Sequence, residues 1–393
     1  MKILFYTDNF LPGGGNRYFI DLINAASSTY EDISILTNKG GLFEEDLQRL
    51  KKEIKITEIN RVSRESFAET LFGQTKLANY LRIFGLVLKP FFFIINYYKF
   101  KRLLKRDKPN LVISSNGGYP AAESSIALVF ASHILGIKSM LTIVSMPASR
   151  RWYLYLYDVI LDKLLSKTDI KLVVNSDAQI NALKEIRGLT NDIYCVYNGL
   201  EDYEHNNSTI SNITQSPILF GTICRLDKGK GLDYLLKAIN ILKGRKMSNI
   251  KFLLFGKGAE YHNLSNLISK FQIEEYVDLK GYFEGQVYEQ LEKFDVFVFP
   301  SLWEGLPYSL VEAQRSGLPI ISTNVGGIPE VVRHMEEGLL LEPQNETALA
   351  NNIEFLANSE QLRAEMSRKA RLRYENLFTL KVMEKDFLKL LSE

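Results

Sequence analysis

The sequence repeats one pattern along its length: a short apolar run, a polar or glycine-containing turn, and then a stretch with helical spacing. Runs that are apolar on both faces are typical of strands in a parallel sheet covered by helices. Strands that alternate with helices of ~10–15 residues form βαβ units, so the pattern predicts an α/β protein with doubly wound parallel sheets. The runs are residues 2–7, 33–37, 111–114, 139–144, 171–174 and 193–196 in a first series and 218–223, 251–255, 276–279, 295–299, 319–322 and 339–341 in a second.

A polar segment separates the two series of runs. Residues 201–216 are rich in Asn, Ser, Thr and Glu and poor in large apolar side chains, as in an interdomain linker. A chain of 393 residues has the length of two ordinary domains. We therefore predict an N-terminal Rossmann-like domain at 1–200 and a C-terminal one at 217–375. Residues 376–393 are expected to form a final helix, and the sequence does not say which domain it packs on.

The composition excludes several classes of protein. A net charge of +2 gives no general affinity for nucleic acid, and the only two cysteines, Cys195 and Cys224, lie far apart. The first residues lead directly into an apolar run without a secretory cleavage pattern. The most apolar region, 84–95, contains Lys89 and Pro90 and is too short to span a bilayer. We expect a cytoplasmic protein without a disulfide framework.

The first strand is followed by three consecutive glycines, of which Gly14 and Gly15 precede Asn16 and Arg17. Glycines let the backbone approach a ligand closely, and the following helix offers free N–H groups to an anion. The turn lacks the third glycine of the dinucleotide fingerprint and the Lys-Ser/Thr ending of a P-loop. Both a flexible turn and a phosphate site fit this pattern.

A second glycine-rich turn opens the C-terminal domain. A strand ends near Arg225, and the turn then carries Lys228 and Lys230 into a helix. Arginine offers a planar fork for phosphate oxygens and lysine a compact positive charge. A solvated basic loop is the alternative, but a position at the carboxyl end of a strand favours phosphate contact.

Two glutamates flank the next turn. Glu304 follows a buried strand, Leu306 and Pro307 lead into a helix, and Glu312 lies further along that helix. Carboxylates so spaced can accept hydrogen bonds from hydroxyls at separate ends of a nucleotide sugar, while N–H groups of the turn approach its diphosphate. The alternative is that Glu304 only caps the helix and Glu312 is solvated.

Taken together, these motifs resemble retaining glycosyltransferase family 4, whose members have the GT-B fold: two Rossmann-like domains that face each other across a cleft. Glu304 and Glu312, with seven residues between them, match the family's Glu-x7-Glu motif. The glycine turn at 13–15, Arg225 and Lys230 match further motifs, as do the segments 197–201, 256–260 and 324–330.

The resemblance implies roles for these residues. Arg225 and Lys230 would stabilise the diphosphate leaving group, and Glu304 would contact the transferred sugar. The implied donor is a UDP-sugar or GDP-sugar bound without a metal; the sequence has four histidines and no Asp-x-Asp motif. The remaining donor-binding residues implied by the resemblance are Gly14, Gly15, Gly281, Tyr282, Leu306, Pro307 and Glu312.

One position departs from the family. Where many members carry a histidine after the strand at 139–144, this chain has Ser145, which we interpret as a replacement that positions the sugar or acceptor, together with Asn116 and Arg17. The missing histidine leaves open a non-catalytic relative or partner subunit that binds sugar nucleotide. A nucleotide-sugar epimerase is a weaker alternative, because the paired glutamates are the transferase pattern.

A basic and aromatic segment suggests where an acceptor would be met. Residues 76–110 hold nine Lys or Arg residues and a single acid, Asp107, among many aromatic side chains. This is typical of a peripheral surface on anionic lipid, to which the cluster 150–153 could add, but a core helix with lysines at its edges also fits. We expect a glycan or lipid-linked acceptor of cell-surface polysaccharide, contact with the inner face of the cell membrane, and no nucleic-acid partner.

Overall fold

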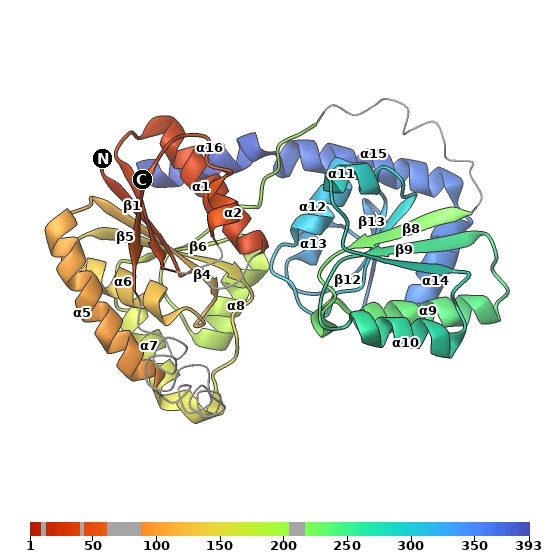
Figure 1. The fold of residues 1–393 in the computed structure, drawn as a ribbon, viewed down its shortest axis with the longest axis horizontal. Coiled ribbons are helices and arrows are strands. Elements are labelled where there is room, and N and C mark those ends of the chain that lie inside the picture. The colour runs from red at the N-terminus through yellow and green to blue at the C-terminus, as the bar shows by residue number, and fades with distance from the viewer. Residues whose placement is uncertain (9–12, 40–42, 61–87, 204–216) are drawn as a thin grey trace. The chain divides into compact units, whose positions relative to one another are not determined.

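The computed structural model describes residues 1–8, 13–39, 43–60, 88–203 and 217–393. The chain divides into two units (Figure 1). The first contains Met1–Tyr197 and Glu384–Glu393, and the second contains Asn198–Met383. Most of the predicted linker, residues 204–216, lies outside the described residues, as do residues 76–87 of the basic segment.

A parallel sheet of seven strands forms the centre of the first unit, in the order β3-β2-β1-β4-β5-β6-β7. Side chains alternate across it: Tyr6 faces one way, with its ring 5.1 Å from that of Phe100, and Phe5 faces the other, 5.6 Å from Phe19. The strands are β1 (Ile3–Thr7), β2 (Ile33–Asn38), β3 (Lys55–Ile59), β4 (Leu111–Gly118), β5 (Lys138–Ser145), β6 (Lys171–Val174) and β7 (Ile193–Cys195).

Helices cover both faces of this sheet, as expected of a doubly wound fold. Phe19 belongs to α1 and Phe100 to α5, so these helices lie on opposite faces. The helices are α1 (Gly14–Thr29), α2 (Glu44–Leu47), α5 (Lys89–Asp107), α6 (Glu123–Ile134), the 3-10 helix η1 (Trp152–Leu154), α7 (Tyr155–Leu165) and α8 (Asp177–Arg187).

The second unit has a parallel sheet of six strands in the order β10-β9-β8-β11-β12-β13. Its strands are β8 (Ile218–Ile223), β9 (Ile250–Phe255), β10 (Val277–Gly281), β11 (Val296–Phe299), β12 (Ile320–Thr323) and β13 (Gly338–Leu341). Its helices are η3 (Lys228–Lys230), α9 (Leu232–Gly244), α10 (Tyr261–Phe271), α11 (Val287–Leu291), α12 (Tyr308–Arg315), α13 (Ile328–Val331), α14 (Glu346–Ala357) and α15 (Glu360–Leu377), followed by α16 (Leu380–Ser392). The predicted fold class, two doubly wound parallel sheets, is confirmed.

Two features differ from the prediction. The edge strand β3 was not predicted, because its sequence Lys-Ile-Thr-Glu-Ile is no apolar run and most of it is exposed. The final helix, expected at 376–393, begins only at Leu380, because α15 continues to Leu377. Between the two helices the backbone N–H of Leu200 donates to the Phe378 carbonyl, and the Leu200 carbonyl accepts from the Leu380 N–H. Residues 384–393 of α16 group with the first unit.

Candidate functional site

Each sheet has one point at which the strand order reverses, and ligands of doubly wound proteins bind beside the carboxyl ends of the strands there. In the first unit the reversal lies between β1 and β4, and in the second between β8 and β11. The turns that follow β8 and β11 carry Arg225, Lys230 and Glu304. The second sheet therefore brings the three predicted catalytic residues to its own reversal point.

Hydrogen bonds join these two turns of the second unit. The backbone N–H of Leu302 donates to the Gly229 carbonyl at 2.7 Å. The buried Ser301 hydroxyl lies 2.9 Å from the same carbonyl oxygen and 2.7 Å from Oε1 of Glu304. One hydroxyl proton can serve only one of these acceptors at a time. Ser301, to which sequence analysis gave no role, thus ties the lysine turn to the glutamate turn.

Lys230 and Glu304 form an ion pair in this turn region. The Lys230 ammonium lies 2.5 Å from Glu304 Oε1, and the two side chains are 15% and 11% exposed. The same ammonium lies 5.1 Å from the centre of the Phe299 ring. Burial raises the pKa of the neighbouring Cys224 thiol to about 12, so this thiol stays neutral at physiological pH. The ion pair at this point therefore joins Lys230 to Glu304, without participation of the Cys224 thiol.

The Glu304 turn is held by two further segments of the second unit. Asn198 donates its side-chain amide to the Leu306 carbonyl at 2.7 Å, and Gly327 N–H donates to the Gly305 carbonyl at 2.9 Å. Gly326 has φ +54°, and a Cβ at this residue would lie 1.9 Å from the Glu304 carbonyl oxygen. No side chain fits at residue 326 unless the Glu304 turn moves.

We therefore expect Gly326→Ala to lower the free energy of unfolding by about 2 kcal/mol or more and to weaken any ligand binding at Glu304. Gly244→Ala is the control, because a Cβ at this helical residue meets no atom within 4 Å, and it should stabilise the protein by about 0.5 kcal/mol. Urea unfolding curves of both variants give the comparison. Equal stability of Gly326→Ala and the parent protein would contradict the close packing described for this turn.

The other predicted donor-site residues of the second unit lie at the same edge of its sheet. Arg225 is 70% exposed and lies 3.3 Å from Asp227. Gly281 ends β10, and the following Tyr282 is 65% exposed with the Lys257 ammonium 4.6 Å from the centre of its ring. Leu306 and Pro307 are buried where α12 begins, and the half-buried Glu312 lies one turn further along this helix.

The predicted residues of the first unit gather at the carboxyl edge of its own sheet. A Cβ on Gly15 would meet Val144 at 2.9 Å, so the glycine turn packs directly against the end of β5. The next residue, Ser145, is exposed and pairs in register with Gly118, and Asn116 pairs with Ile143. Gly14 and Arg17 lie in the first turns of α1.

A buried carboxylate at this edge was missed by sequence analysis. Asp8, 7% exposed, follows β1 and accepts hydrogen bonds from Ser124 at 2.6 Å and from Asn38 at 2.7 Å. It therefore links the ends of β1 and β2 to the start of α6. The only signal in the sequence was its position one residue after a buried strand.

Arg150 and Arg151, which we expected to add to a lipid-binding surface, point instead into the first unit. Arg150 Nε lies 2.9 Å from Asp162, and Arg151 Nη2 lies 2.6 Å from Asp158. The fully buried Arg187 contacts both of these carboxylates. The expectation for Arg150 and Arg151 is wrong, because the acids of α7 and Arg187 supply buried partners that sequence spacing does not reveal.

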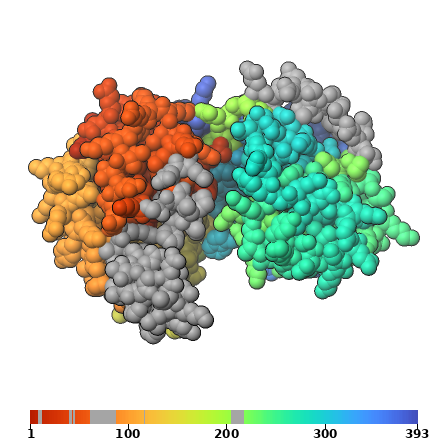
Figure 2. Space-filling model, viewed as in Figure 1, coloured from red at the N-terminus to blue at the C-terminus, as the bar shows by residue number. Residues whose placement is uncertain are grey.

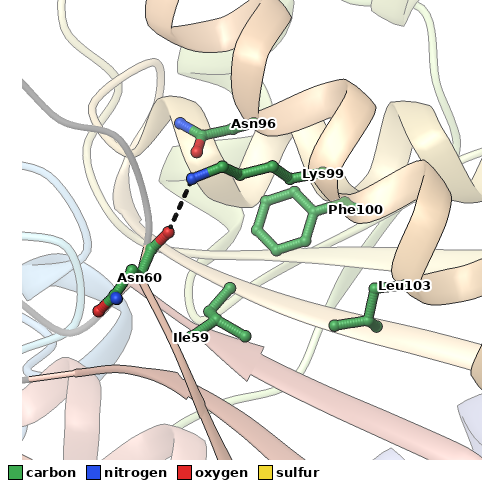
Figure 3. A pocket seen from close by; sticks show the side chains of 6 residues that line it. All are labelled: Ile59, Asn60, Asn96, Lys99, Phe100 and Leu103. Atoms are coloured by element: carbon green, nitrogen blue, oxygen red, sulfur yellow. Dashed lines mark hydrogen bonds between the residues drawn. The ribbon is translucent and has the colours of Figure 1, made fainter.

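A cavity of about 240 Å³ lies beside α5 in the first unit (Figure 3). Ile59, Phe100 and Leu103 give it a largely apolar wall, and Asn96 also lines it. Lys99 crosses its edge to donate to the Asn60 carbonyl at 3.2 Å. None of the predicted site residues lines this cavity.

The described residues contain neither a cluster of metal ligands nor a helix that could span a membrane. Within those ranges, no three His, Cys, Asp or Glu side chains cluster in a way that could hold a metal ion. No helix in the same ranges is both long enough and apolar enough to cross a bilayer.

Comparisons with known proteins agree with this geometry. Residues 204–373 match the model of the family "Glycosyl transferases group 1". Over 186 residues, 45% of each chain, the protein is 29% identical to the putative colanic acid biosynthesis glycosyltransferase WcaL of Escherichia coli. It is 27% identical over 197 residues, half of this chain and 52% of the other, to a Campylobacter jejuni N-acetylgalactosaminyltransferase whose name specifies a diphospho-undecaprenol substrate. The chain thus spans about half the length of these curated relatives.

The fold has solved counterparts. The structure of HepE from Anabaena in complex with UDP superposes with a TM-score of 0.77, at 19% identity and over all of both chains. At that identity the likeness shows the fold alone, which is the GT-B fold expected from the sequence motifs.

Proposed function

We propose, from the match of residues 204–373 to the model of the family "Glycosyl transferases group 1", that the whole chain transfers a hexose-type sugar from a nucleotide diphosphate donor to an acceptor. The observation that carries the proposal is the Lys230–Glu304 pair at the strand-order reversal of the matched unit. The cation of this pair can bind the anionic diphosphate of a donor, and the carboxylate can bind the hydroxyls of its sugar.

The proposed chemistry follows from charge. When the glycosidic bond to the diphosphate breaks, negative charge grows on the leaving phosphate, and Lys230 and Arg225 are the cations near it. Arg225 is largely exposed and pairs at 3.3 Å with the partly exposed Asp227, whereas the more buried Lys230 contacts Glu304 and Phe299. Glu304 would accept hydrogen bonds from sugar hydroxyls and Glu312 from the ribose, with Tyr282 beside the base. Retention of anomeric configuration and independence from metal belong to the same proposal.

We further propose a glycan or lipid-linked acceptor of cell-surface polysaccharide, met at the membrane. The names of the Escherichia coli and Campylobacter jejuni relatives support this class of acceptor. In the described part of 76–110, helix α5 turns Phe91, Ile94 and Tyr98 outward, each at least half exposed. Peripheral contact of this helix with anionic lipid would keep such an acceptor close.

A thermal-shift screen with UDP-sugars, GDP-sugars and the free diphosphates, in the presence of EDTA, tests the donor proposal. A ligand at a hundred times its dissociation constant stabilises the folded state by about 2.7 kcal/mol, which moves the melting temperature of the binding unit clearly. We expect one nucleotide to give this shift and Arg225→Ala to remove it. Arg245→Ala, which breaks a surface pair with Glu354 in the same unit, is the matched control and should keep it. Absence of a shift with every nucleotide would contradict the proposal.

The alternative is a non-catalytic protein that binds sugar nucleotide, favoured only by Ser145 at the place of the family's histidine. Slow release of free sugar from the bound donor in the absence of acceptor separates the two. A transferase loses some donor to water, whereas a binding protein returns it intact.

A further inference from the structure

The outward face of η1 and α7 is unusually apolar for a surface helix. Trp152 is 87% exposed, Leu156 71%, Ile160 47% and Leu164 51%. Leu156, Ile160 and Leu164 are spaced by four within α7, so they form one stripe along this helix, and the exposed Trp152 precedes it in η1. The exposed Lys163 and Lys167 flank the stripe near its end. We call these six residues the α7 outer face.

The acids of the same helix all point the other way. Asp158 and Asp162 lie two residues, and so about half a turn, from Leu156 and Ile160. Their side chains are 0% and 3% exposed and are bound by Arg151, Arg150 and Arg187. Although burial opposes ionisation, hydrogen bonds from Arg151 hold the pKa of Asp158 below its usual range. The helix thus keeps both of its carboxylates inside, and the charged groups of the α7 outer face are positive.

We propose that the α7 outer face binds the surface of an anionic lipid bilayer. A helix with tryptophan and aliphatic residues on one face and lysines at its edge fits the boundary between headgroups and acyl chains. Both charged groups of the face are cationic, so a surface of anionic phospholipid complements them. The exposed Asp169 lies beyond the end of this helix and contacts His133 at 2.6 Å.

The position of the α7 outer face indicates where a lipid-linked acceptor would be met, an inference that rests on the proposed function. Glu123 at the start of α6 pairs with Lys89 at the start of α5 and lies 3.9 Å from Arg151, directly before Trp152. The helices α6 and α7 follow β4 and β5, whose carboxyl ends carry Asn116 and Ser145. The lipid-binding face therefore begins at the edge of the sheet that bears the proposed acceptor-positioning residues. A lipid-linked acceptor could reach that edge without leaving the bilayer.

Tryptophan fluorescence of the full chain tests the contact directly, because the sequence has only two tryptophans, Trp152 and Trp303. In Trp303→Phe the emission comes from Trp152 alone, and we expect a blue shift on adding vesicles of equimolar phosphatidylglycerol and phosphatidylcholine. Trp152→Phe, in which Trp303 is the only emitter, is the matched control and should show no shift. An unchanged Trp152 emission would overturn the proposal, as would a blue shift that grows with protein concentration without lipid, which would indicate a second copy on this face.

Variants then distinguish the contribution of the α7 outer face to vesicle binding from that of α5, and distinguish both from nucleotide binding at the donor site. Leu156→Ser/Ile160→Ser should reduce co-sedimentation with the same vesicles by about tenfold or more, and added salt should weaken the binding of the parent protein. Phe91→Ser/Ile94→Ser measures the contribution of α5, and retention of full binding by the α7 variant would overturn the proposal. The nucleotide-induced thermal shift should remain in the α7 variant. A protein that binds vesicles but no nucleotide would contradict the proposed function and leave the α7 surface supported.

Discussion

Replacing Lys230 by methionine is expected to lower the rate of donor cleavage about a hundredfold to a thousandfold. Lys230 is the cation fixed at the strand-order reversal of the second unit, and methionine keeps the length of the side chain without its charge. Removal of one group that stabilises growing negative charge in a transition state costs a factor of this size. Release of UDP or GDP from the donor identified by the thermal-shift screen, followed with and without acceptor mixtures, measures the effect.

Two further variants make this result interpretable. Lys237→Met removes a partly exposed lysine of α9 that pairs with Asp233 and should leave donor cleavage within about twofold of the parent, since exposed charges contribute little. Lys230→Met alone leaves the Glu304 carboxylate largely buried without its cation, which also destabilises the turn. Lys230→Met/Glu304→Gln removes that unpaired charge, so it should regain stability but not activity. Donor cleavage at the parent rate in Lys230→Met would show that the assignment of this lysine is wrong.

Local sequence patterns predicted most of the fold. Runs apolar on both faces marked every buried strand, and β6 and β8 have the predicted bounds. The edge strand β3 was not predicted, because an edge strand needs few apolar residues and Lys55 and Glu58 interrupt its apolar pattern. The break between α15 and α16 was not predicted, because Leu200, whose backbone bonds to both sides of it, lies far away in the sequence.

The candidate site shows the same limit. The glycine-rich turns and the two glutamates are local motifs, so their residue types and spacing could be found in the sequence. The contact of Lys230 with Glu304 joins residues 74 positions apart and became visible only when the order of β8 and β11 was known. Arg150 and Arg151 were placed on the surface because a sequence does not show that Arg187 and the acids of α7 lie behind them. The sites assigned from motifs remain predictions until the variants are measured.

Replacing Arg187 by methionine is expected to lower the free energy of unfolding of the first unit by about 3–5 kcal/mol. Arg187 is fully buried, and its Nη2 lies 2.9 Å from Asp162. Its guanidinium also lies 5.1 Å from the centre of the Tyr119 ring, whose hydroxyl donates to Asp162 at 2.9 Å. Methionine fills part of the space but leaves two buried carboxylates with one cation fewer. Urea unfolding of the variant and the parent protein, followed by circular dichroism, measures the loss.

The matched control is Arg106→Met, which breaks an arginine–aspartate pair of the same unit whose arginine side chain is 73% exposed and should leave the free energy of unfolding close to that of the parent protein. The pH dependence separates lost charge pairing from lost packing. The pKa of Asp158 is held below its usual range, so the stability from its ionised form is present above about pH 4 and is lost as the pH falls toward the folded-state pKa. In Arg187→Met the same acidification neutralises a carboxylate that has lost a partner. The difference in stability between the two proteins should therefore narrow at acid pH, whereas a difference constant with pH would mean that Arg187 acts by packing alone.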